Sequence, residues 1–239
     1  MQPWKTPHRQ NVTRTRLSIL LALALFPIGA SADEVKTTVR KVPYPTAPEP
    51  ERPKKITLES AYNRWSVKVV WDRVHGIENS FEARLMTSDV IAGLANQLAK
   101  TSPMSEAQAQ TLYEERCKKY YGSAERGAFG EKIVFMGHIE LDSETYTAGQ
   151  LNTSWQFSLL AEDGKPLAPA KVEMGDVRLQ KSSATGIGSW YRVFTVTFDN
   201  MDPMTKKRVV TAGIHHLTLA VKGVSGEGRA TFAFDSSAR

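Results

Sequence analysis

The run IVFMGHIEL at residues 133–141 carries the pattern that decides the fold. Apolar positions alternate with more polar ones along it: Ile133, Phe135, Gly137, Ile139 and Leu141 against Met136, His138 and Glu140. Successive side chains of a strand point to opposite faces, so a period of two predicts a strand with one buried face.

The same alternation recurs along the rest of the chain. We expect further strands around residues 65–71, 155–159, 172–179, 194–198, 217–221 and 231–234, with turns at Asp163-Gly164 and at residues 223–228. About seven short strands separated by turn residues predict an immunoglobulin-like antiparallel β-sandwich. The alternative is an α+β arrangement, an antiparallel sheet with helices on one face.

Between the first and second of these strands the period changes to that of a helix. Residues 87–121 predict two helices, the first capped by Thr87 or Ser88 and the second opened by the capping box of Ser105 and Gln108. We therefore expect a two-helix insertion after the first strand of the sandwich.

The N-terminus has the three parts of a cleavable signal peptide. A basic stretch without acidic residues precedes the apolar run LSILLALALFPI at residues 17–28, and small residues at Ala30 and Ala32 precede Asp33. The alternative is a membrane anchor, but a spanning helix needs ~20 apolar residues. We expect cleavage after Ala32 by the general secretory route, and a periplasmic or secreted protein with no membrane span after cleavage. No cysteine lies near residue 33, so we expect no lipid anchor.

The composition is that of a globular protein and argues against nucleic-acid binding. The 239 residues are 41% hydrophobic and 23% charged. Removing residues 1–32 leaves 207 residues and takes away four basic ones, which lowers the net charge from +6 to +2. Nucleic-acid binding is not expected at that charge. Residues 33–55 are proline-rich and predict an extended tether, and residues 56–239 predict a single globular domain.

Candidate metal ligands are few. His138 and Glu140 share one face of a predicted strand, but two ligands fall short of the three or four of a zinc site. The acidic run at residues 199–202 lacks the spacing of a calcium loop and is interpreted as a turn. The one cysteine, Cys117, is interpreted as a small buried hydrophobe. We expect no metal and no other cofactor.

The signatures of nucleophilic catalysis, such as Gly-x-Ser-x-Gly and Ser-x-x-Lys, are missing. Trp190 and Tyr191 follow a flexible stretch at a strand entrance and are the candidate ligand-binding aromatics. The sequence thus predicts a non-catalytic bacterial envelope protein that binds a protein or a glycan. The alternative is a secreted hydrolase with an unrecognised active site.

Overall fold

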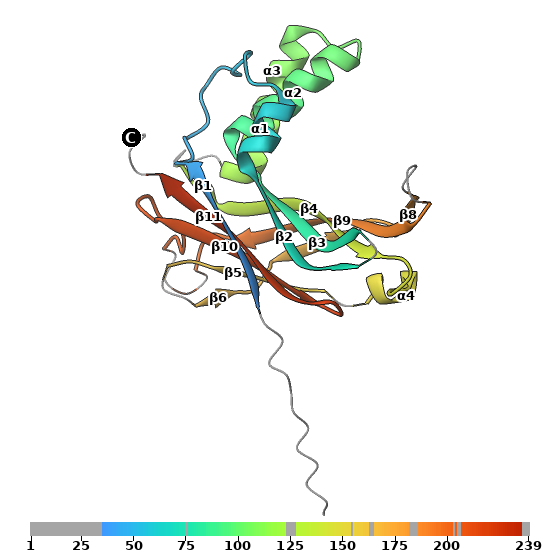
Figure 1. Ribbon diagram of the computed structural model, residues 1–239. Coiled ribbons are helices and arrows are strands. Elements are labelled where there is room, and N and C mark those ends of the chain that lie inside the picture. The colour runs from blue at the N-terminus through green and yellow to red at the C-terminus, as the bar shows by residue number, and fades with distance from the viewer. Residues whose placement is uncertain are drawn as a thin grey trace, which may run out of the picture. The chain divides into compact units, whose positions relative to one another are not determined.

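The computed structural model describes residues 35–74, 76–122, 128–153, 155–162, 165–181, 186–202, 204 and 207–235 (Figure 1). All of them belong to one compact unit, residues 33–239. The predicted signal peptide and its cleavage residues Ala30, Ala32 and Asp33 lie outside the described residues, as does the predicted turn at Asp163-Gly164.

One sheet, sheet A, joins the N-terminal strand to four strands from the C-terminal half of the chain. Its order is β1 (Lys36–Pro43), β11 (Gly226–Asp235), β10 (His216–Gly223), β5 (Gln156–Leu160) and β6 (Pro166–Leu167). Neighbours are antiparallel except β1 and β11, which run parallel with Val39 opposite Thr231.

The second sheet, sheet B, is antiparallel throughout. Its order is β2 (Ser66–Val74), β3 (Ile77–Leu85), β4 (Lys132–Asp142), β9 (Gly188–Asp199) and β7 (Lys171–Met174), and β8 (Arg178–Lys181) pairs with β9 further along the same edge. The long β9 is therefore shared by two short strands that follow each other in the chain.

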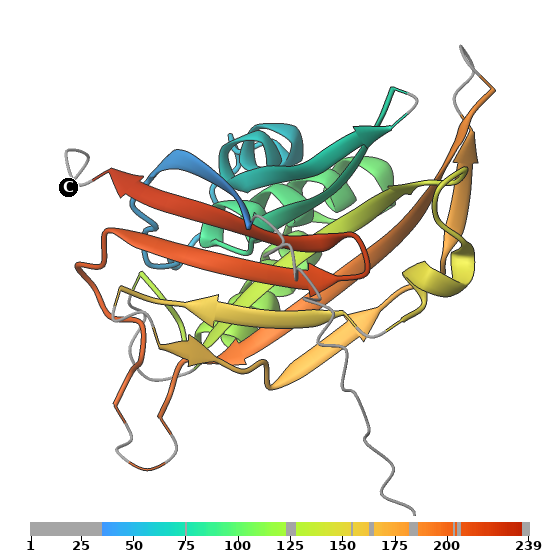
Figure 2. The same ribbon diagram turned by 60° about the horizontal axis from the view of Figure 1, so that its bottom comes forward.

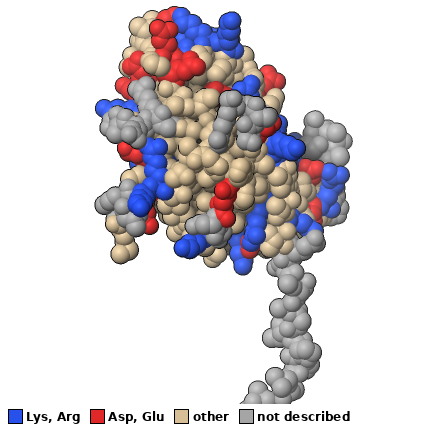
Figure 3. Space-filling view, turned by 90° about the vertical axis from the view of Figure 1, so that its left-hand side faces the viewer, with Lys and Arg blue, Asp and Glu red and all other residues tan. Residues whose placement is uncertain are grey.

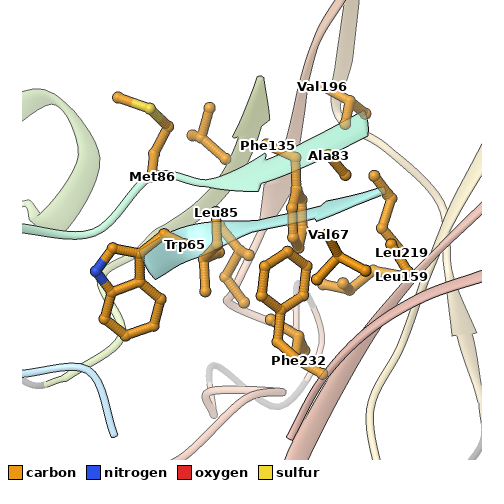
Figure 4. Close-up of a cluster of buried hydrophobic side chains, with 14 of the residues drawn as sticks. Trp65, Val67, Ala83, Leu85, Met86, Phe135, Leu159, Val196, Leu219 and Phe232 are labelled. Atoms are coloured by element: carbon orange, nitrogen blue, oxygen red, sulfur yellow. The ribbon is translucent and has the colours of Figure 1, made fainter. Parts of the chain in front are cut away.

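The two sheets face each other across one hydrophobic core. Phe135 of β4 lies 5.7 Å from Phe232 of β11, and Phe157 of β5 lies 5.1 Å from Phe194 of β9, measured between ring centroids. Figure 4 shows side chains from both sheets meeting around Phe135 and Phe232. At Gly137 a Cβ would come within 2.5 Å of the Phe194 ring, so this close approach requires glycine.

Helices form a third layer. They are α1 (Leu58–Trp65), α2 (Ser88–Thr101), α3 (Glu106–Tyr121) and the short α4 (Ala148–Leu151). Figures 1 and 2 show α1, α2 and α3 on the side of sheet B that faces away from sheet A. There the Tyr62 ring of α1 lies 3.7 Å below the guanidinium of Arg84 on β3. None of the described helices is long and apolar enough to cross a membrane.

The mainly β prediction is confirmed, and so is the helical pair with its caps at Thr87 and Ser105. An immunoglobulin-like sandwich is not confirmed, and the sheets are not closed. The helical pair follows β3 and not the first strand. The prediction placed it one strand too early because it did not include β1 and β3. Trp65 was assigned to a strand but ends α1, and its indole donates to Asp89 at the start of α2.

The predicted tether is also corrected within its described part, residues 35–55. Residues 36–43 form β1, since proline enters only at the last position of that strand. Residues 44–55, here called the strap, pack on the helices through their carbonyl oxygens, which proline retains. Tyr113 donates to the Glu49 carbonyl at 3.2 Å, and Asn96 donates to the Pro53 carbonyl at 2.9 Å.

Candidate functional site

The two predicted binding aromatics lie on opposite faces of β9. Trp190 is opposite Leu141 on the core side, and its indole N–H donates to the Tyr146 carbonyl at 2.8 Å. Tyr191 lies on the outer side of sheet B, where its ring stacks on His138 at 4.7 Å between centroids. The structure does not bring Trp190 and Tyr191 together into one aromatic platform.

Tyr191 belongs instead to a polar cluster on the outer face of sheet B. His138 is directly opposite Glu82 on β3, and Glu140 is directly opposite Tyr191 on β9. Burial lowers the pKa of His138, although the carboxylates of Glu82 and Glu140 act in the opposite direction. Glu82 is held by Arg84 at 2.6 Å. Among the described residues no group of three or more His, Cys, Asp and Glu side chains could hold a metal ion, here or elsewhere.

The acidic run at residues 199–202 leads from the end of β9 into a short antiparallel pairing, and Pro203, which belongs to the predicted turn, lies outside the described residues. The Asp202 amide donates to the Lys207 carbonyl at 2.9 Å, and Met201 bridges to Arg208. Asn200 is fully buried and holds neighbouring backbone, so it points into the protein rather than toward an ion.

A groove on the outer face of sheet A is the strongest candidate site. It has a volume of about 650 Å³ and crosses four strands, β1, β11, β10 and β5. The pairing registers place outward side chains in rows across these strands. One row runs from Val39 through Thr231 and Thr218 to Leu160, and the next from Thr37 through Arg229 and Ala220 to Ser158.

The floor of the groove consists of small side chains, and the larger residues on either side shield them from solvent. Thr218 and Thr231 are 7% and 9% exposed although they point away from the core. Their hydroxyl groups lie 2.8 Å apart and satisfy each other. Val39, on the β1 side, is 61% exposed and forms an apolar wall.

Opposite charges mark the two ends of the groove. At one end Glu162 accepts a hydrogen bond from the His215 amide, and its carboxylate lies 4.0 Å from the His216 ring nitrogen. At the other end Arg229 is paired with Glu227 at 3.2 Å. Such a surface can hold a ligand along its centre, against the apolar wall, and orient it by charge at the ends.

Comparison of the chain with known protein families finds no match, and comparison with curated proteins finds none either.

Sequence reasoning missed the groove because it missed β1. Without β1 the outer positions of β11 are at the edge of the sheet, and no wall stands beside Thr231. A usable signal was present: Thr37, Thr38, Val39 and Val42 make this stretch rich in β-branched residues. The prolines that follow this stretch led us to predict an extended tether there instead of a strand.

Proposed function

We propose that the chain is an exported, non-catalytic binding module of the bacterial envelope, and that its ligand lies in the groove of sheet A. The observation that carries the proposal is the row of small, covered side chains between an apolar wall and charged ends. The signal-peptide pattern of residues 1–32 supports export. Two facing, mainly antiparallel sheets support an immunoglobulin-like classification of the domain.

The ligand chemistry that suits the groove is an extended segment of another envelope protein. Val39 and Leu160 offer apolar contacts on the two walls, while Glu162 and Arg229 offer one charge of each sign. Its lining includes one aromatic residue, Phe234, which is only 7% exposed. Flat stacking on a sugar ring therefore has little support there, and a polypeptide with apolar residues between charged ones fits better.

The test uses a photo-crosslinking amino acid at position 39 in living cells, with position 224 as the matched control. Val224 is also an exposed valine, at 45%, but it lies in the turn between β10 and β11. We expect the probe at 39, and not the one at 224, to capture one protein repeatedly. Equal products at both positions would contradict the assignment of the groove.

Binding of the captured partner is then measured with purified proteins. Val39→Glu should weaken binding by roughly tenfold or more, because it puts a charge on the apolar wall, whereas Val224→Glu should leave it unchanged. If the protein instead binds isolated cell-wall glycan, and Val39→Glu abolishes that binding, the ligand of the groove is a glycan and not a protein.

A secreted hydrolase remains the second candidate, and one observation favours it. His216 and Glu162 form an imidazole–carboxylate pair at the end of the groove, and the Thr218 hydroxyl lies two residues further along the same face of β10. If the groove is an active site, His216→Ala should abolish hydrolysis of envelope esters or glycans while the fold is kept. No hydrolysis by the unmodified protein in such a screen would exclude this function for those substrates.

A further inference from the structure

The edge of sheet B at β7 is open in the described part of the chain. β7 pairs with β9 on one side and is the last strand of the sheet on the other. An open edge presents backbone N–H and C=O groups that another strand can pair with. What decides the partner is the direction of these groups and the side chains between them.

The hydrogen-bond register shows which residues of β7 face outward. The Gly175 amide donates to the Val193 carbonyl, so Gly175 faces β9. Residues two apart share a direction, so Glu173 and Lys171, opposite Thr195 and Thr197, also face β9. The backbone N–H and C=O of Val172 consequently point away from β9, toward the open edge.

The side chains at this edge are exposed and include apolar ones. Val172 is 40% exposed and Leu179 of the adjoining β8 is 45% exposed. Both are paired with core-side residues of β9, Val196 and Trp190. The apolar face of sheet B thus continues past the strands of sheet A that cover it.

We propose that a second copy of this chain pairs with this edge, β7 against β7, antiparallel about a two-fold axis at Val172. In this register the two Val172 residues exchange their outward N–H and C=O groups. Each Lys171 then lies opposite Glu173 of the second copy, in a non-hydrogen-bonded pair, where side chains approach most closely. The sequence Lys-Val-Glu is therefore self-complementary in charge in the register that the backbone dictates.

Both charged side chains are available for this contact. Lys171 and Glu173 have side-chain exposures of 64% and 57%, and within one chain they form a surface ion pair at 2.7 Å. Exposed pairs of this kind contribute little to the stability of a single chain. In the dimer this pair lies beside the same pair of the second copy, so that four charges of alternating sign meet at the two-fold axis. Val172 and Leu179 add apolar area beside it.

A charge-swap experiment tests the arrangement by sedimentation of the exported protein at low salt. The unmodified chain should show a concentration-dependent dimer. Lys171→Glu alone and Glu173→Lys alone each turn both cross-copy pairs into like-charge pairs, so each should weaken dimerisation by roughly tenfold or more. The double variant Lys171→Glu/Glu173→Lys restores opposite charges and should restore dimerisation to within about threefold of the unmodified chain.

Lys222→Glu is the matched control for charge. Lys222 lies on β10 opposite Glu227 within sheet A, and its substitution should leave dimerisation unchanged. Amide exchange at Val172 gives a local readout, since this N–H should become protected as protein concentration rises. A monomer at all concentrations, or single variants that dimerise like the unmodified chain, would overturn the proposal. A double variant that folds but dimerises as weakly as the single variants would overturn the proposed register.

Discussion

At the scale of the residue, Asn200 shows how one side chain joins three segments. It is fully buried at the end of β9. Its Nδ2 donates to the carbonyls of Gly130 and Val210 at 2.9 and 3.0 Å, and its Oδ1 accepts from the Val210 amide at 2.6 Å. The loop before β4 and the chain around Val210 are thereby both hydrogen-bonded to the end of β9.

Replacing Asn200 should therefore be costly. Asn200→Ala leaves two carbonyls and one amide buried without their partner, and we expect it to lower the free energy of unfolding by about 3 kcal/mol. Urea denaturation measures the difference, with the exposed Asn152→Ala expected to stay within about 0.5 kcal/mol of the unmodified protein. A cost below about 1 kcal/mol for Asn200→Ala would show that these bonds are replaced by water.

At the scale of the element, periodicity predicted the strands and helices whose pattern is uninterrupted. β4 was predicted because every second residue is apolar or glycine, and α3 because its capping box marks its start. β3 was missed because a buried asparagine, Asn79, stands in its apolar series. That asparagine accepts from the Asp142 amide at 2.6 Å, a contact between residues far apart in sequence.

The pairing of β1 could not be predicted in the same way. A parallel partner 190 or so residues away leaves no local signal of register, and the prolines that follow favour an extended spacer. That Trp190 and Tyr191 lie on opposite faces also follows from strand geometry. Neighbouring residues such as Trp190 and Tyr191 must face opposite ways once both lie in one strand, and the strand β9 begins earlier than was expected.

Removal of β1 should destabilise the domain. A chain that begins at Tyr44 lacks this strand, so the edge of β11 and the pocket filled by Val42, which is 2% exposed, become open to water. We expect it to lose at least ~3 kcal/mol of unfolding free energy relative to a chain that begins at Lys36. Equal stability of the two chains in urea would mean that residues 36–43 are a spacer after all.

At the scale of the whole molecule, the helices, the strap and sheet B share one buried layer. Tyr113 and Tyr121 of α3 are 1% and 5% exposed, and Tyr113 bonds to the strap. In Figure 3 acidic and basic side chains lie side by side over the helices, while uncharged side chains dominate the middle of that face. The helical layer is thus joined to the rest by buried contacts, and its charges remain at the surface.

This arrangement predicts how the protein unfolds in alkali. Burial raises the pKa of both Tyr113 and Tyr121 above the ordinary value of 10.0, with Cys117 adding to the effect. A pKa that is higher in the folded state means that stability is complete below pH 10 and is lost as the pH rises above it. Each of these tyrosines should add up to about 1.4 kcal/mol of lost stability per pH unit there.

Tyr113→Phe separates this effect from ordinary packing. At pH 7 the variant should be about 1 kcal/mol less stable, because the bond to the Glu49 carbonyl is gone. At pH 11 the deficit should shrink or reverse, because the unfolded state of the variant no longer gains free energy by ionising this phenol.

Thiol labelling of Cys117, the one cysteine, which is buried on α3, follows opening of the helical layer. In a chain that carries Trp65→Phe and Trp190→Phe, the fluorescence of Trp71 and Trp155, which lie 6.0 Å apart, follows the ends of both sheets. Since all three layers share a core, the two signals should change together; labelling of Cys117 while the tryptophan signal stays native would show that the helices unfold on their own.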